Sequence, residues 1–228
     1  MVRLSLPLAT LAFFIASTSA LPFIPRQSCA TGFHIIVARG SNEAPGEGKP
    51  GQVATLIKNA VPGSDSVAVD YPAAICCADL YPESVADGIT DTINKIHSYV
   101  AACPDARIVL VGFSQGGNVM TDALAGGVSK PDPLAEAYRK NIAGVVVFGD
   151  PSYSEGQSFD VGTSTRDGIF TRSDNGDSLA LLNTYAAVLR SYCDEGDPFC
   201  ASGVDEDVHS NEVPNHAQEA ADFIVSLA

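Results

Sequence analysis

The chain has 228 residues, of which 46% are hydrophobic and 18% charged, and its formal net charge at pH 7 is -14. This composition excludes a disordered chain, which lacks apolar residues, and a protein with several membrane spans, because only one long apolar run is present. The 27 acidic residues outnumber the 13 basic ones, so we expect no nucleic-acid partner, because phosphate binding needs clustered Lys and Arg.

The N-terminus resembles an export signal. Arg3 is followed by an apolar stretch at residues 4–15 and by small residues that end at Ala20. That order is typical of a secretory signal peptide, and the stretch is too short to span a membrane. We therefore predict a signal peptide at residues 1–20, a short leader at residues 21–28, and a secreted, extracellular protein.

Short apolar runs alternate with segments of helical spacing along the rest of the chain. Buried strands are predicted at residues 33–37, 66–71, 107–111, 142–148 and 187–192. Helices are predicted at residues 52–60, 82–102, 116–125 and 216–227. Residues 152–178 are rich in Gly, Ser and Asp, which predicts a long loop.

Continuously apolar strands that alternate with helices indicate a parallel sheet covered on both faces. We predict one α/β domain over residues 29–228. Its expected architecture is a small α/β-hydrolase-like three-layer sandwich with a central, mostly parallel five-stranded sheet. In such folds, ligand sites form beyond the carboxyl ends of the strands.

The chain contains six cysteines, and their even number in a secreted protein indicates disulfide bonds without choosing the pairs. A zinc site would need two closely spaced Cys or His pairs, and no Cys-x-x-Cys occurs. We therefore expect no metal ion. The cysteines are Cys29, Cys76, Cys77, Cys103, Cys193 and Cys200.

A Gly-x-Ser-x-Gly motif occupies residues 112–116, after a predicted strand and before a predicted helix. It has the form of a nucleophile elbow, a turn so tight that the residues two before and two after the serine lack side chains. The following helix directs its positive dipole end at the same place. This context predicts Ser114 as a nucleophile rather than an incidental serine in a glycine-rich turn.

A serine nucleophile needs a base, usually a histidine, and the histidine needs an orienting acid. In folds with this elbow the acid and then the histidine follow the serine along the chain. Only His209 and His216 follow Ser114. His34, in a predicted strand, and His97, on a predicted helix, are interpreted as structural residues.

Three aspartates are candidates for the orienting acid. Asp197 is the first candidate and Asp194 the last, and both lie between Cys193 and Cys200, whose disulfide would clamp the loop. Rigidity matters there because a misplaced acid leaves the histidine in the wrong tautomer. Asp150 also follows a predicted strand and remains a rival.

Together these motifs resemble the fungal cutinase and acetylxylan esterase family (carbohydrate esterase family 5), which consists of small secreted serine esterases. The resemblance covers nearly the whole mature chain. It is carried by residues 38–41, similar to the oxyanion loop of cutinases, by residues 112–117, by the loop 193–200, and by His209, which precedes Phe223 by fourteen residues.

The resemblance implies a role for each motif residue. Ser114 would be the nucleophile, His209 the base and Asp197 the orienter. Ser41, through its hydroxyl and backbone N–H, and Gln115, through its backbone N–H, would form the oxyanion hole. No cofactor is implied.

The resemblance also implies a disulfide pattern. The pairs are Cys29 with Cys103 and Cys193 with Cys200. Cys76 and Cys77 are left over, either as a strained vicinal disulfide or as thiols.

The expected activity is a carboxylic ester hydrolase of the cutinase type that acts on short aliphatic or cutin esters of the plant cuticle or cell wall. An acetylxylan esterase is the alternative activity, and a non-catalytic secreted binding protein is a remote alternative. A protease is not favoured, because the sequence shows no recognisable peptide-binding feature. The acidic residues in the loop 201–208 disfavour fatty acyl chains if they face the substrate, and say nothing if they face solvent. We expect a monomer without a membrane partner.

Overall fold

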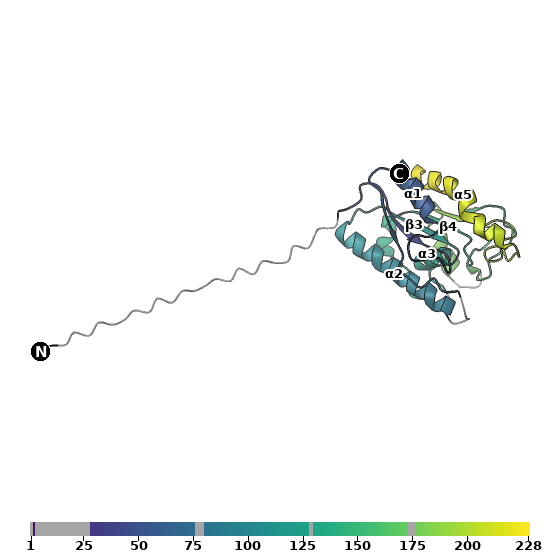
Figure 1. Ribbon diagram of the computed structural model, residues 1–228, viewed down its shortest axis with the longest axis horizontal. Helices are drawn as coiled ribbons and strands as arrows, with labels where there is room; N and C mark the ends of the chain where they lie inside the picture. Colours follow the sequence, from purple (N-terminus) through teal and green to yellow (C-terminus); the bar gives the residue numbers. More distant parts are fainter. Residues whose placement is uncertain (1, 3–27, 76–79, 128–129, 173–176) are drawn as a thin grey trace.

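A computed structural model describes residue 2 and residues 28–75, 80–127, 130–172 and 177–228 (Figure 1). The predicted signal peptide and leader therefore lie almost wholly outside the described residues. Cys76 and Cys77 lie outside them as well. Within the described residues, no helix is both long enough and apolar enough to cross a membrane.

The described chain folds around a parallel sheet of six strands in the order β2-β1-β3-β4-β6-β5. β3 lies in the middle of the sheet and ends directly before Ser114, the serine of the Gly-x-Ser-x-Gly motif. The strands are β1 (His34–Ala38), β2 (Asp65–Ala68), β3 (Ile108–Phe113), β4 (Ile142–Phe148), β5 (Asp160–Val161) and β6 (Leu189–Tyr192).

The predicted α/β class with a parallel sheet is confirmed, but the sheet has six strands rather than five. The additional strand, β5, lies in the segment 152–178 that was predicted to be loop, and Asp160 pairs with Ser191 of β6. Two residues are too few to show a periodic apolar pattern, so only pairing with a neighbour reveals this strand.

Helices cover both faces of the sheet, so the molecule has three layers. Figure 1 shows α1 and α5 on one side of β3 and β4, and α2 with α3 on the other. The helices are α1 (Gly51–Ala60), α2 (Leu80–Ala102), α3 (Gln115–Ala125), a 3-10 helix (Glu136–Asn141), α4 (Ser178–Asn183) and α5 (Glu206–Ser226).

Alternate residues of the central strands supply the two halves of the core. Val111 of β3 packs into the cluster with Ile57 of α1 and Ile224 of α5. Its neighbour Leu110 points the opposite way, into the cluster with Ile96 of α2. α3 begins directly after Ser114 and is buried along its whole length. This packing fixes the N-terminal end of α3, where the serine lies.

The last helix begins at Glu206 rather than at His216, where the sequence pattern predicted it. Asp205 caps it by accepting a hydrogen bond from the backbone N–H of Asp207. Acidic residues in the first turn stabilise the helix by their interaction with the positive end of its dipole. Pro214 lies inside the helix. Because proline usually marks a helix boundary, it obscured the first two turns in the sequence.

Two disulfides tie loops to the framework, and they are the pairs that the resemblance implied. Cys29 is bonded to Cys103, which joins the start of the described domain to the end of α2. Cys193 is bonded to Cys200 and closes the loop between β6 and α5.

Candidate active site

Ser114 lies at the carboxyl end of β3, where the chain turns into α3. Its backbone has φ 55° and ψ -122°, a conformation that residues with side chains rarely adopt. A Cβ atom at Gly112 would lie 2.3 Å from the carbonyl oxygen of Gly116, and one at Gly116 would lie 2.1 Å from that of Ala38. The motif glycines are thus required by close backbone contacts, one of them with β1.

His209, on the first turn of α5, lies between Ser114 and Asp197. Its Nε2 is 2.9 Å from Ser114 Oγ, and its Nδ1 is 2.6 Å from Asp197 Oδ2. Asp197 is fully buried, whereas Ser114 keeps 9% and His209 7% of its surface exposed. The predicted serine, histidine and first-choice aspartate are therefore brought into one hydrogen-bonded line, in which only the serine and the histidine keep a small exposed surface.

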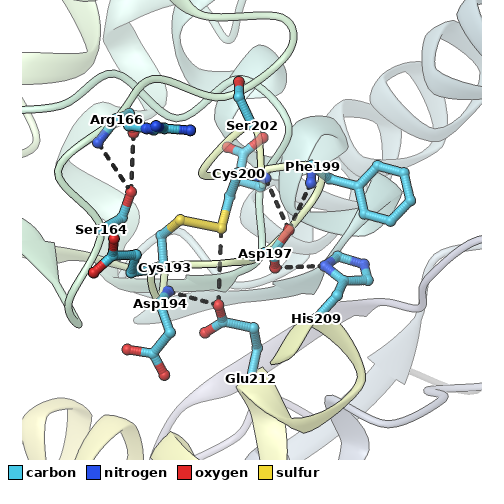
Figure 2. Close-up of a disulfide and its surroundings, with 12 residues drawn as sticks. Ser164, Arg166, Cys193, Asp194, Asp197, Phe199, Cys200, Ser202, His209 and Glu212 are labelled. Carbon is cyan, nitrogen blue, oxygen red and sulfur yellow. Dashed lines mark hydrogen bonds and ion pairs between the residues drawn. A yellow bond between two sulfur atoms is a disulfide. The ribbon is translucent and has the colours of Figure 1, made fainter. Parts of the chain in front are cut away.

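The loop between Cys193 and Cys200 holds Asp197 in place. Asp197 Oδ1 accepts the backbone N–H groups of Phe199, at 2.7 Å, and of Cys200, at 3.0 Å. Figure 2 shows these bonds beside the disulfide, with Oδ2 directed at the imidazole of His209. The ring of Phe199 packs edge-on against that imidazole, with the centroids 4.5 Å apart.

The two other candidate acids have different partners. Both oxygens of Asp150 are used: Oδ1 accepts the backbone N–H and the hydroxyl of Ser152, and Oδ2 accepts the hydroxyl of Thr121. Asp194 Oδ2 lies 2.8 Å from Nε2 of His216. His216 thus pairs with Asp194, two helical turns beyond His209 on α5.

The two remaining histidines pack against aromatic side chains. His34 stacks on Tyr99 with ring centroids 3.6 Å apart, and its Nδ1 is 2.5 Å from Asp65 Oδ1. The ring of His97 packs against Tyr138 at a centroid distance of 4.2 Å. These contacts give both residues packing roles.

The loop after β1 carries Ser41 and packs against the serine motif, since a Cβ at Gly116 would contact the carbonyls of both Ala38 and Arg39. The Ser41 hydroxyl is buried and has no hydrogen-bond partner among the residues that the structure describes. An unpartnered buried hydroxyl is unfavourable unless something else uses it.

Gln115 begins α3, so its backbone N–H has no partner within the helix. Its buried side chain is held on the other side: Ser84 Oγ donates to Oε1 at 2.9 Å, and Nε2 donates to the Ala74 carbonyl at 2.7 Å. The Gln115 side chain is therefore held by Ser84 and Ala74 and does not occupy the backbone N–H of its own residue.

Arg39 is a supporting residue to which the motif analysis assigned no role. It is buried, and its guanidinium donates to the carbonyls of Glu43 at 2.9 Å and Tyr71 at 2.6 Å. Glu43 Oε2 in turn accepts the backbone N–H of Gly40 at 2.6 Å. A charged residue directly after a continuously apolar strand is the sequence signal that could have revealed this support.

Glu212 is a second residue that the sequence analysis missed. It is fully buried on α5, one turn after His209. The signal appears only when the helix is known to start at Glu206, because His209, Glu212 and His216 then lie three and four residues apart on one face.

Asp194, Glu212 and His216 also bring three possible metal ligands within 4.8 Å of one another. Glu212 Oε1 accepts the backbone N–H of Asp194 at 2.7 Å, and His216 is paired with the Asp194 carboxylate. The arrangement is therefore accounted for without an ion.

A pocket of about 340 Å³ lies along α3, one turn beyond Ser114. Its wall includes Tyr81 and Phe170, whose ring centroids are 5.6 Å apart. Asn118 and Asp122 supply polar groups, and Asn118 Oδ1 accepts the Tyr81 hydroxyl at 3.3 Å. The pocket thus combines aromatic and hydrogen-bonding surface, and Ser114, His209 and Asp197 are not among the residues that line it.

Comparison with known sequences decides the family, because the family model described as Cutinase matches residues 29–228. The chain belongs to the cutinase family. This cutinase-family chain is 32% identical to Cutinase 11 of Verticillium dahliae, over 92% of its own length and 73% of that protein. It is also 32% identical to Acetylxylan esterase 2 of Talaromyces purpureogenus, over 94% and 97% of the two chains.

Solved structures of relatives have the same fold. The catalytic core domain of acetyl xylan esterase from Trichoderma reesei has a TM-score of 0.79 at 31% identity, covering 88% of this chain and 100% of that one. The cutinase from Trichoderma reesei in complex with a phosphonate inhibitor has a TM-score of 0.60 at 25% identity, covering 87% and 78%. The cutinase-family chain described here is therefore a carboxylic ester hydrolase, and the family resemblance is confirmed.

Proposed function

We propose that this protein is a secreted serine esterase in which Ser114 is the nucleophile, His209 the base and Asp197 the acid that orients His209. The observation that carries the proposal is the unbroken hydrogen-bonded line from Ser114 Oγ through both nitrogens of His209 to Asp197 Oδ2. The nucleophile assignment gains support from the strained turn at Ser114, which places the serine at the start of a helix.

The reaction follows from these contacts. His209 Nε2 takes the hydroxyl proton as Ser114 Oγ attacks the ester carbonyl carbon, and Asp197 stabilises the imidazolium. The Ser41 hydroxyl and the N–H groups of Ser41 and Gln115 bind the tetrahedral oxyanion. The carbon–oxygen bond then breaks, the alcohol leaves with the proton from His209, and water hydrolyses the acyl-enzyme by the same route.

Replacing Ser41 by alanine is expected to lower kcat by about 10²–10³-fold, the typical effect of losing one oxyanion donor. The melting temperature should not fall, because the Ser41 hydroxyl makes no hydrogen bond within the described structure. Steady-state hydrolysis of p-nitrophenyl acetate and a thermal melt measure the two effects. An unchanged kcat would remove Ser41 from the oxyanion hole.

For the substrate, we infer a short acyl group, with acetylated xylan as the favoured polymer. Two observations support this choice over cutin. The TM-score to the acetyl xylan esterase core, 0.79, exceeds that to the cutinase, 0.60. The pocket along α3 also presents Asn118 and Asp122 beside its aromatic wall, a surface suited to a sugar rather than to a long alkyl chain.

Cutin is the second candidate, and exposed apolar side chains favour it. Ile169 and Phe170, at the rim of the same pocket, are 46% and 49% exposed, which suits contact with an apolar polyester surface. The acidic residues before His209 do not decide the question. Asp205, Glu206 and Asp207 are exposed and form the cap and first turn of α5.

Hydrolysis of p-nitrophenyl esters from acetate to palmitate, together with acetate release from acetylated xylan, tests the substrate proposal. We expect the rate to fall sharply beyond acetate and xylan to be deacetylated. A maximum at butyrate or longer, without release from xylan, would favour cutin. No turnover of any ester above that of Ser114→Ala would contradict an esterase and favour a non-catalytic binding protein.

We further propose that residues 1–20 direct export and are removed, and that residues 29–228 act as one catalytic domain and as a monomer. The two disulfides support an oxidising, extracellular location. The intact mass of the secreted protein tests cleavage after Ala20, and its elution volume tests the monomer.

A further inference from the structure

Glu212 is a fully buried carboxyl group that the proposed reaction does not use. Its place on α5 is between His209 and His216, facing the loop that carries Asp197, as Figure 2 shows. A buried acid is unfavourable unless its environment satisfies or neutralises it. The groups around Glu212 therefore indicate its protonation state and its role.

The two oxygens of Glu212 have different surroundings. Oε1 accepts the backbone N–H of Asp194 at 2.7 Å and lies 3.8 Å from Cys200 Sγ, so it contacts both ends of the disulfide loop. Oε2 is buried and receives no hydrogen bond from any donor that the structure describes. Asp197 is among the groups whose influence raises the pKa of the Glu212 carboxyl.

A hydrogen bond between two carboxyl groups requires a proton on one of them. Asp197 already accepts three hydrogen bonds, from the backbone of Phe199 and Cys200 and from His209. Glu212 accepts one backbone bond and has an oxygen without any donor. The shared proton therefore belongs on Glu212, which then donates to Asp197.

The electrostatic environment agrees with this assignment. Burial raises the pKa of Glu212 to about 8, with the negative charges of Asp194 and Asp197 adding to the rise and the Asp194 backbone bond opposing it. On its own helix, His209 and His216 flank it, and His216 Nε2 lies 4.0 Å from Oε2. Behind His216 lies Tyr192 of β6, with ring centroids 5.1 Å apart.

We propose that Glu212, as a neutral carboxylic acid, is a positioning residue for ester hydrolysis: it donates a hydrogen bond to Asp197, accepts one from the backbone of Asp194, and so holds the disulfide loop against the helix that carries His209. The inference rests on the roles proposed above for Asp197 and His209. Glu212 itself touches neither the substrate nor the reacting atoms.

Ionisation of Glu212 would remove this support. Its anion has no proton to donate and would place a second negative charge against Asp197, so the loop and the imidazole would lose their alignment. Misplacement by about 1 Å can lower a rate by about 10²-fold. Activity should therefore fall as the pH rises through about 8, the pKa of Glu212.

The pH dependence of kcat for p-nitrophenyl acetate, measured from pH 5 to 10, tests the proposal in three variants. Glu212→Gln remains neutral at every pH and keeps a donor and an acceptor. Its kcat should stay within about threefold of the wild-type value at pH 7, and the decline centred near pH 8 should disappear. Glu212→Leu fills the space without either bond, and kcat should fall about 10- to 100-fold with KM unchanged.

Asp222→Asn is the matched control, because Asp222 is an exposed acid on the same helix whose carboxylate accepts from Gln218. Its profile should coincide with that of the wild type. If the profile of Glu212→Gln also coincides with it, the positioning role is wrong, even if Glu212→Leu fails to fold. Ser114→Ala separates failure of the proposed function from failure of this inference. The activity of Ser114→Ala tests the proposed function, whereas the pH profile of Glu212→Gln tests only the positioning role of Glu212.

Discussion

Replacing Ser114 by alanine should lower kcat for ester hydrolysis by about 10⁶-fold, leaving the fold intact. The hydroxyl oxygen is the atom that bonds to the acyl group, so no acyl-enzyme can form without it. Substrate binding and the oxyanion donors proposed at Ser41 and Gln115 would remain, and they would leave a residual rate of about 10³–10⁴ over water.

Two measurements check this prediction. The first is the burst of p-nitrophenol, about one equivalent per active site in the wild type when deacylation limits the rate and absent in Ser114→Ala. The second is the mass added by a phosphonate ester, which should label Ser114 alone. Ser210→Ala is the control, because Ser210 is an exposed serine beside His209 whose backbone carbonyl accepts from Lys49. A variant that keeps more than about 1% of the activity would place the nucleophile elsewhere.

Replacing Asp197 by asparagine should lower kcat by about 10⁴-fold. The amide would keep an oxygen for the backbone N–H groups of Phe199 and Cys200, so the loop should hold its shape. Its NH₂ group, however, would donate to His209 Nδ1 and force the proton onto Nε2, the atom that must accept the proton of Ser114. The loss arises from the wrong tautomer rather than from disorder.

Asp150→Asn is the informative control for this prediction, since sequence order alone allowed Asp150 as the acid. Its carboxylate binds Ser152 and Thr121, so the substitution should lower the free energy of unfolding by about 1–3 kcal/mol and leave kcat within about tenfold. Steady-state kinetics and urea denaturation of both variants measure these quantities. The opposite pattern, with Asp150→Asn the inactive variant, would reverse the assignment of the acid.

Both predictions depend on atoms that the fold holds within hydrogen-bond distance although the residues are far apart in the chain. Ser114 and His209 are separated by 95 residues, and Asp197 and His209 by 12. The central strand β3 places Ser114 at the carboxyl end of the sheet. The Cys193–Cys200 disulfide closes the loop that holds Asp197 beside the start of α5. Rigid elements therefore supply the alignment that catalysis by such a group requires.

The sequence alone determined the features that depend on local constraints. Apolar runs and helical spacing predicted the parallel α/β class, because each pattern reflects burial of one short segment. The glycines at residues 112 and 116 predicted the turn around Ser114, because that turn is too tight for side chains. Chain order left only His209 and His216 as bases, and the resemblance chose His209.

Only the tertiary structure decided the features that depend on contacts between distant segments. The resemblance implied Asp197 as the acid, but only the folded loop shows that Asp197, and not Asp150, lies within hydrogen-bond distance of His209. β5 forms because β6 pairs with it. α5 starts well before Pro214, at the cap that Asp205 supplies. Glu212 carried no signal in the sequence, because its burial and its hydrogen bond with the backbone of Asp194 arise only when α5 packs against the disulfide loop.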